Sequence, residues 1–342
     1  MSGARELLSR LLSHDLPRNR WLAIALIAIV VALALTPFIF PGTKALNVAA
    51  KVIVFIVLAA SFDLLLGYTG IVSFAHTMFF GIGAYGVAIA ATRLGPTWPA
   101  LAVGVVAALA TSLVLSLVIG LFSLRVRAIF FAMITLAVAS AFATLASQLS
   151  EFTGGEDGLT FKVPLDSRFV AYYLIFGVAL VLVLMLLRIV NSPFGRVLQA
   201  IRENDFRAEA IGYRTVVYRT IASVVSALFA TLAGVLLALW LRYNGPDTTL
   251  SFEIMLDVLL IVVIGGMGTM YGAVVGSVLL VLAQNYLQDL MKLAAGAVEG
   301  VPVLAQIVSP ERWLLWLGLL FVLSVYYFPS GVVGRLRGSR RR

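Results

Sequence analysis

Apolar runs alternate with short polar stretches along almost the whole chain, and most runs have about the 20 residues that an α-helix needs to cross a bilayer. This pattern predicts an all-α polytopic membrane protein with about ten transmembrane helices. The first run is too long for a signal peptide, and no small-residue cleavage site follows it. The predicted spans are residues 21–40, 46–66, 71–92, 98–122, 128–149, 169–190, 220–241, 252–264, 270–291 and 313–328.

Composition indicates one membrane domain and no soluble domain. Hydrophobic residues make up 61% of the 342 and charged residues only 12%, whereas soluble proteins have about 25% charged residues. The mean hydropathy is +1.04. We expect a cytoplasmic N-terminal segment (1–20), a transmembrane domain (21–328) with a cytoplasmic loop at 191–219, and a basic cytoplasmic tail (329–342).

The basic residues set the expected orientation. With the N-terminus in the cytoplasm, 17 of the 25 lysines and arginines fall on the cytoplasmic side, as the positive-inside rule requires. Omitting one span would move either the tail or the 191–219 loop outside, so both termini are expected inside. The formal charge of +9 then follows from membrane topology, and lipid rather than nucleic acid is the expected surroundings.

The 191–219 loop carries the signals of two short amphipathic helices. Ser192 followed by a proline is typical of a helix start, and an apolar stripe follows at helical spacing. Asp205 can cap a second helix that runs through Ile211, and Gly212 is suited to end it with a positive φ. Helices this short need a protein surface to lie on. An ordinary charged loop is the alternative, but the capping and the stripe favour a docking element.

Glycine-rich turns separate two pairs of spans, at Gly67–Gly70 and Gly265–Thr269. Further glycines follow each turn at close spacing. Small residues let helices approach closely in lipid, whereas interrupted spans can also line a polar path. We favour the packing interpretation.

The chain offers little catalytic chemistry. It contains no phosphate-binding loop of the nucleotide-hydrolysing kind, no cysteine and only two histidines, so we expect neither an ATPase site nor a metal site. Ser73 and His76 are three residues apart on one predicted helical face. An intramembrane hydrolase is one explanation, but a helix-packing hydrogen bond is the simpler one. We do not expect an enzyme.

Charged residues inside a bilayer are costly and therefore informative. Lys51, Asp63 and Asp257 are each expected near an interface, which argues against an ion relay and a tight site for a charged substrate. An ion-coupled secondary amino-acid transporter remains a remote alternative. The expected path is a weakly binding conduit lined by small polar side chains: Thr69, Ser73, His76, Thr77 and Thr269.

Five motifs resemble, in order and spacing, those of permeases in the branched-chain amino-acid ABC importer family, specifically the M-type (LivM-like) subunit. Ala75 and Thr77 depart from the usual glycine and alanine, which bears on packing or selectivity rather than on membership. The resemblance covers about residues 46–330, and its motifs are GYTGIVSFAHTMFFGIGAY (67–85), TGGEDGL (153–159), SPFGRVLQAIREND (192–205), AEAIG (208–212) and GGMGT (265–269).

The resemblance implies a type II ABC importer architecture in the inner (plasma) membrane of a bacterium. It implies uptake of leucine, isoleucine and valine, although related permeases carry urea, short amides or aromatic compounds. The implied partners are an H-type permease, two cytoplasmic ATPases that carry ATP and Mg²⁺, and an extracytoplasmic binding protein. No cofactor is implied in this chain itself.

The resemblance also assigns roles to two loops. The loop between the sixth and seventh spans would dock on the ATPases, and the outer loop before the sixth span would face the binding protein. A plain turn at Gly154-Gly155 is the alternative for the outer loop. The residues implied for ATPase coupling are Arg196, Arg202, Glu203, Asp205, Arg207, Glu209 and Gly212, and those for binding-protein docking are Glu151, Glu156 and Asp157.

Overall fold

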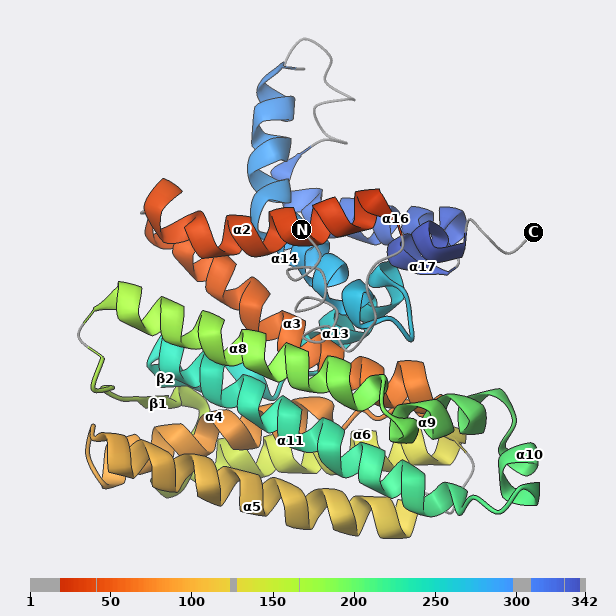
Figure 1. Cartoon of the computed structure of the whole chain (residues 1–342). Helices are drawn as coiled ribbons and strands as arrows, with labels where there is room; N and C mark the ends of the chain where they lie inside the picture. The colour runs from red at the N-terminus through yellow and green to blue at the C-terminus, as the bar shows by residue number, and fades with distance from the viewer. Residues whose placement is uncertain are drawn as a thin grey trace, which may run out of the picture.

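The computed structural model describes residues 19–40, 42–123, 128–165, 167–297, 309–328 and 330–338. Ten long helices in these ranges coincide with the ten predicted spans (Figure 1). They are α2 (Arg20–Ile39), α3 (Thr43–Thr69), α4 (His76–Arg93), α5 (Trp98–Ser123), α6 (Ala128–Gln148), α8 (Arg168–Val190), α11 (Thr215–Leu241), α13 (Phe252–Gly265), α14 (Met270–Ala297) and α16 (Trp313–Tyr327).

Short elements connect these helices. The expected all-α fold is confirmed apart from two-residue strands β1 and β2, which pair antiparallel. Residues 1–18 of the predicted N-terminal segment and residues 339–342 of the predicted tail lie outside the described residues. The short elements are α7 (Ser150–Thr153), η1 (Gly155–Asp157), β1 (Leu159–Thr160), α9 (Pro193–Glu203), α10 (Asp205–Ala210), β2 (Tyr243–Asn244), α12 (Pro246–Thr249), η2 (Pro310–Arg312) and α17 (Gly331–Gly338).

Helix α4 differs from the other nine long helices. Nine stretches of the described residues have the length and hydropathy of a membrane span, and α4 is not among them. It has 18 residues and begins at His76, not at the predicted residue 71. Residues 70–75 are not helical, because Gly70 ends α3 with φ 75° and turns the chain. The chain is polytopic, and α4 is a largely buried helix that begins at a histidine and ends at an arginine.

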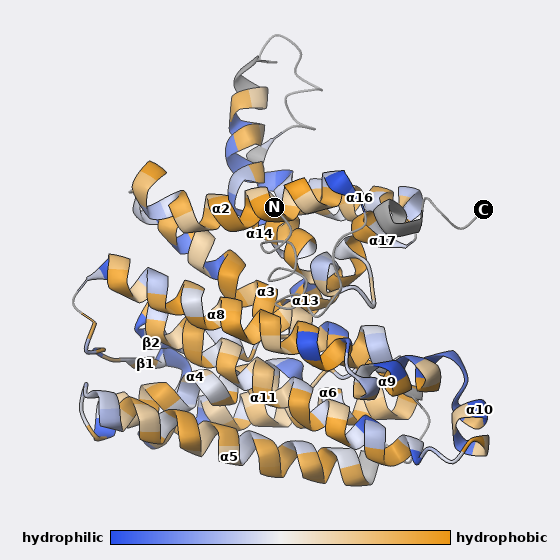
Figure 2. Cartoon of the chain, in the orientation of Figure 1, coloured by the Kyte–Doolittle hydropathy of each residue, from blue (hydrophilic) through white to orange (hydrophobic). Residues whose placement is uncertain are grey.

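Helix α3 forms the centre of the molecule. It runs between α2 and α16 on one side and α8 and α11 on the other (Figure 1), and almost all of its residues from Leu46 to Thr69 are buried. The peripheral helices α2, α5 and α6 instead expose most of their apolar side chains. Figure 2 shows this apolar exterior and the hydrophilic residues gathered at the α9–α10 end. Apolar exteriors of this kind suit contact with lipid or another membrane subunit.

Glycines let α4 and α11 cross in backbone contact. A Cβ built on Gly83 would lie 1.9 Å from the carbonyl oxygen of Thr231, and one on Gly234 would lie 1.8 Å from that of Phe80. These distances leave no room for a methyl group. The packing interpretation of the glycines after the first turn is therefore confirmed.

Replacing Gly234 with alanine should destabilise the protein, because the methyl group must push α4 away from α11. Overpacking typically costs about 1–3 kcal/mol, so we expect a lower thermal midpoint of the purified protein in detergent. Gly177→Ala in α8 is the matched control, because nothing lies within 4 Å of a Cβ there. Equal midpoints for the two variants would contradict the close crossing.

Candidate functional site

Helix α9 has the predicted amphipathic form. The Ser192 hydroxyl accepts a hydrogen bond from the Gly195 N–H at 3.5 Å, which caps the first turn. Leu198 and Ile201 are fully buried against the membrane domain. Phe194 stacks on Tyr218 of α11 with ring centroids 5.8 Å apart. One face of the helix is therefore packed on the ends of the long helices.

The second helix, α10, begins differently from the prediction. Its cap is Asn204, whose Oδ1 accepts from the Arg207 N–H at 2.9 Å. Asp205 was the predicted cap, but it is the first helical residue and forms an ion pair with Arg219 of α11 at 2.8 Å. Gly212 has the predicted positive φ, at 96°. The helix ends at Ala210, one residue before the predicted end.

Arg202 joins this segment to the interior of the membrane domain. From the last turn of α9, its Nη1 donates a hydrogen bond to the carbonyl oxygen of Gly67, 135 residues earlier in the chain. The side chain also lies beside Gly70 and Gly268, where added Cβ atoms would be 3.3 Å and 2.9 Å from it. One arginine therefore contacts both glycine-rich turns.

Asp63 contacts both glycine-rich turns close to Arg202. Its Oδ1 accepts a hydrogen bond from the Gly268 N–H at 2.8 Å, and the residue is only 1% exposed. Its other oxygen is buried and has no hydrogen-bond partner among the described residues, but the carboxyl group is attracted electrostatically to Arg202. Asp63 does not reach solvent in this subunit, because Gly67 and the 265–269 turn cover it; its expected place near a membrane interface stays a prediction.

The turns themselves tolerate no side chain. A Cβ on Gly67 would lie 2.3 Å from the Gly268 nitrogen and 2.1 Å from Asp63 Oδ1, while Gly266 and Gly268 have φ values of 119° and 80°. Glycine is required at such positions. A Cβ on Gly331, the first residue of α17, would lie 2.2 Å from Gly266 Cα. Part of the predicted basic tail is thus a helix, α17, that packs on the junction of the two glycine-rich turns.

The remaining predicted coupling residues lie on the outer side of the segment. Glu209 accepts a hydrogen bond from the Thr215 hydroxyl at 2.6 Å, and the residues that are exposed are Arg196, Glu203, Arg207 and Glu209. Two large apolar residues missed by the sequence analysis also point outward: Phe206 is 86% exposed and Ile211 is 68% exposed. The sequence could have indicated that Phe206 is exposed, because it lies in the first turn of α10, beyond the apolar stripe by which α9 packs on the membrane domain.

The predicted path residues are buried inside this subunit, with exposures of 8% or less. Thr69 donates a hydrogen bond to the Leu65 carbonyl oxygen of α3, and Thr269 donates to the Gly266 carbonyl oxygen of its own turn. His76 Nε2 lies 2.9 Å from the Ser61 hydroxyl of α3. The helix-packing hydrogen bond is therefore present, but its partner is Ser61. Ser73 lies in the non-helical 70–75 segment, so the prediction that it shares a helical face with His76 is wrong. A role in the path stays a prediction for all five.

The outer loop forms a compact turn at the opposite end of the helices from α9 and α10 (Figure 1). Gly154, Gly155 and Gly158 all have positive φ. Arg93 holds the loop by donating to the Glu151 carbonyl oxygen at 2.6 Å. Glu151, Glu156 and Asp157 are exposed, and their role in docking stays a prediction.

Comparison with known proteins finds permeases of similar sequence. The chain is 27% identical over 324 residues to the high-affinity branched-chain amino acid transport system permease protein LivM of Salmonella typhimurium, covering 84% of this chain and 74% of the relative. It is 26% identical, with the same coverage, to the protein of that name from Escherichia coli. It is 28% identical over 163 residues, 47% of this chain and 45% of the relative, to a probable branched-chain amino acid transport permease protein LivM of Methanocaldococcus jannaschii.

No solved structure matches the chain. The sequence profile of one family matches residues 44–325, which include nine of the ten long helices, the α9–α10 segment and both glycine-rich turns. The chain therefore belongs to the family described as branched-chain amino acid transport system, permease component.

Proposed function

We propose that this permease forms one half of the membrane pore of an ABC importer that takes up branched-chain amino acids. The observation that carries the proposal is the α9–α10 segment. It packs on the ends of the long helices and reaches both glycine-rich turns through Arg202. A segment with one face fixed and the other exposed is suited to receive movement from a cytoplasmic partner and pass it to the helices.

The proposed cytoplasmic partner is a pair of ATPase subunits that hold ATP and Mg²⁺. Exposed aromatic residues surrounded by charge are typical of protein-binding surfaces. The α9–α10 segment and the residue after it offer Phe206 and Ile211 together with five exposed charged residues. This surface supports docking of a soluble protein, and the Arg202 contact supplies a route from the dock to the helix ends.

The other proposed partners follow from the family. A second, H-type permease would complete the pore, and an extracytoplasmic binding protein would deliver substrate at the loop that bears Glu151, Glu156 and Asp157. The names of the three relatives support leucine, isoleucine and valine as substrates. We place the complex in the plasma membrane of a bacterium, the inner membrane where there are two, with both termini of this chain inside.

Reconstitution of the complex in proteoliposomes tests the proposal. With both permeases, the ATPases and loaded binding protein, we expect ATP-dependent uptake of leucine. With this chain as the only permease, we expect neither uptake nor ATP hydrolysis, because the pore lies between two unlike subunits. Robust uptake by this permease alone would contradict the half-pore proposal. Uptake of urea, a short amide or an aromatic acid in place of leucine would redefine the substrate.

A further inference from the structure

Charged residues of opposite sign lie on one face of the membrane domain, away from the α9–α10 segment. Lys51 is two turns into α3 and Asp257 is in the second turn of α13, and both are partly exposed. Helices α3 and α13 pack against each other, and this packing brings Lys51 within electrostatic reach of Asp257. Within the described part of the chain they form no direct ion pair, so each keeps capacity for another partner.

Each group is held in place by one neighbour. Asp257 Oδ1 accepts a hydrogen bond from Gln284 Nε2 of α14 at 2.7 Å, which orients the carboxylate. The Lys51 ammonium group lies 5.2 Å from the ring centroid of Phe55, one turn along α3. Glu253 precedes Asp257 by one turn of α13 and interacts with it, which adds negative potential on that side. The arrangement is polarised, with a cation on α3 and acidic groups on α13.

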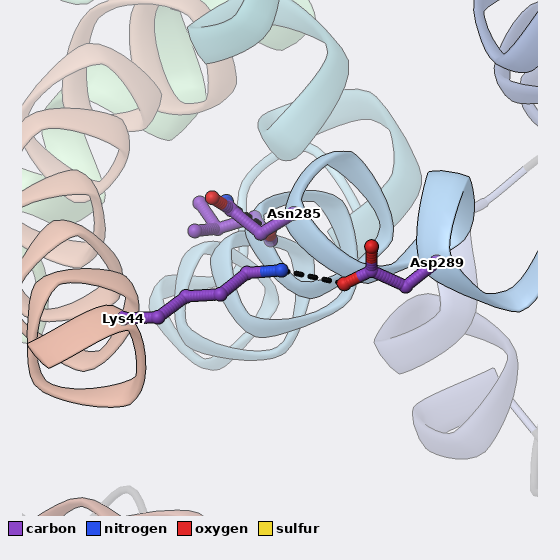
Figure 3. A network of polar contacts seen from close by, with 4 residues as sticks. Lys44, Asn285 and Asp289 are labelled. Carbon is purple, nitrogen blue, oxygen red and sulfur yellow. Dashed lines mark hydrogen bonds and ion pairs between the residues drawn. The ribbon is translucent and has the colours of Figure 1, made fainter. Parts of the chain in front are cut away.

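The neighbouring ion pair shows the contrasting case. Lys44, at the start of α3, forms an ion pair with Asp289 of α14 at 2.5 Å (Figure 3). It also lies over the ring of Tyr286. This lysine is satisfied by its own chain, whereas the Lys51 ammonium has neither an ion-pair nor a hydrogen-bond partner in the described ranges. Helix α3 thus carries one lysine that is ion-paired with α14 and one lysine, Lys51, that has no ion-pair partner among the described residues.

Facing lipid would be costly for these groups. An exposed ammonium or carboxylate in the hydrocarbon region costs several kcal/mol, and such groups therefore face water or protein. The lipid-compatible faces of α2, α5 and α6 are apolar instead. The surface that bears Lys51 and Asp257 is accordingly the one expected to border an aqueous path.

We propose that Lys51 and Asp257, with Gln284 orienting the carboxylate, form a transient site for the backbone of a zwitterionic α-amino acid. The substrate carboxylate would pair with the Lys51 ammonium, and the substrate ammonium with the Asp257 carboxylate. Both are charge-assisted contacts. Because both groups are partly exposed, binding would be weak and the substrate would leave readily. The inference rests on the proposed function and sharpens it, since uncharged urea or a short amide gains nothing from two opposite charges.

The proposed site is weak and partly exposed, so it is compatible with the expectation that no tight site for a charged substrate exists within the membrane. Lys51 and Asp257 are 206 positions apart in the sequence, so their proximity depends on the packing of α13 beside α3 and was not visible from periodicity. A site for the backbone charges, common to all α-amino acids, also leaves side-chain selection to the binding protein.

The test uses the complete complex in proteoliposomes with loaded binding protein. We expect Lys51→Met and Asp257→Asn each to slow leucine uptake at least about tenfold, which corresponds to about 1.4 kcal/mol of barrier. Complex yield and ATP hydrolysis stimulated by loaded binding protein should stay within about twofold of wild type. Lys51→Arg keeps the cation and should restore most of the uptake. Lys44→Met is the matched control on the same helix and should change uptake less than about twofold.

The outcomes separate the site from the function. An active wild-type complex with unimpaired Lys51→Met and Asp257→Asn variants would overturn the site alone. Loss of complex yield in those variants would assign the charges to the interface with the second permease and would also overturn the site. A wild-type complex that takes up no amino acid would overturn the proposed function, and the site with it.

Discussion

Arg202→Met is expected to uncouple ATP hydrolysis from transport. The substitution removes the charged hydrogen bond from α9 to the Gly67 carbonyl and the cation that faces Asp63. A hydrogen bond to a charged group contributes about 1.5–3 kcal/mol, so uptake should fall by about 10- to 100-fold. The ATPases should still bind, because the exposed residues of α10 are unchanged. Uptake and hydrolysis are measured together in the reconstituted complex, as amino acids transported per ATP.

Two further variants separate coupling from general damage. Arg188→Met removes an exposed arginine at the end of α8. It should leave the number of amino acids transported per ATP unchanged. Asp63→Asn keeps an oxygen for the Gly268 N–H but removes the charge that attracts Arg202. Its effect should therefore be non-additive with that of Arg202→Met. Strict additivity, or normal transport in Arg202→Met at normal expression, would contradict the proposed route through this junction.

Phe206→Ser is expected to detach the ATPases. A side chain that is 86% exposed on the proposed docking surface is suited to fill a pocket on the partner, and such aromatic anchors contribute about 2 kcal/mol or more. We expect the affinity for the ATPase subunits to fall at least about 30-fold, measured as the concentration of added ATPase that restores uptake. Folding should be unaffected, because the side chain is almost entirely exposed in this subunit.

Phe152→Ser provides the matched control at the other end of the molecule. Phe152 is also an exposed aromatic residue, 52% exposed, but it lies in α7 beneath Arg93. Its loss should leave ATPase affinity unchanged. Equal losses of ATPase affinity in the two variants would show that Phe206 acts through general stability, and no loss in Phe206→Ser would remove it from the docking surface.

Local signals in the sequence were sufficient for most of the fold. Apolar run length gave the ten long helices, and the Ser192 cap and Gly212 gave the limits of the α9–α10 segment, because these features depend on residues within one or two turns. The start of α4 was predicted five residues too early, at 71 rather than at His76. Hydropathy alone does not show that Gly70 turns the chain after α3.

The contacts that organise the candidate site could not be predicted from local sequence signals, because they join residues far apart in the chain. Arg202 meets Gly67, and Asp63 meets Gly268, across separations of 135 and 205 residues. These partners depend on how α3, α9 and the 265–269 turn pack in three dimensions. Asp63 was placed near an interface because only its distance from a helix end was known. Burial of a charged group is decided by what covers it, and here the cover comes from another part of the chain.

The close crossing of α4 and α11 has a consequence for biosynthesis. Its glycine-lined face is complementary to α11, and Thr231, which Gly83 contacts, is synthesised 148 residues later. At about 5–20 residues per second, that interval lasts roughly 7–30 s. During it, the glycine-lined face of α4 has not yet met its final partner. The close crossing of α4 and α11 is therefore expected to form late, after most of the other helices have been synthesised.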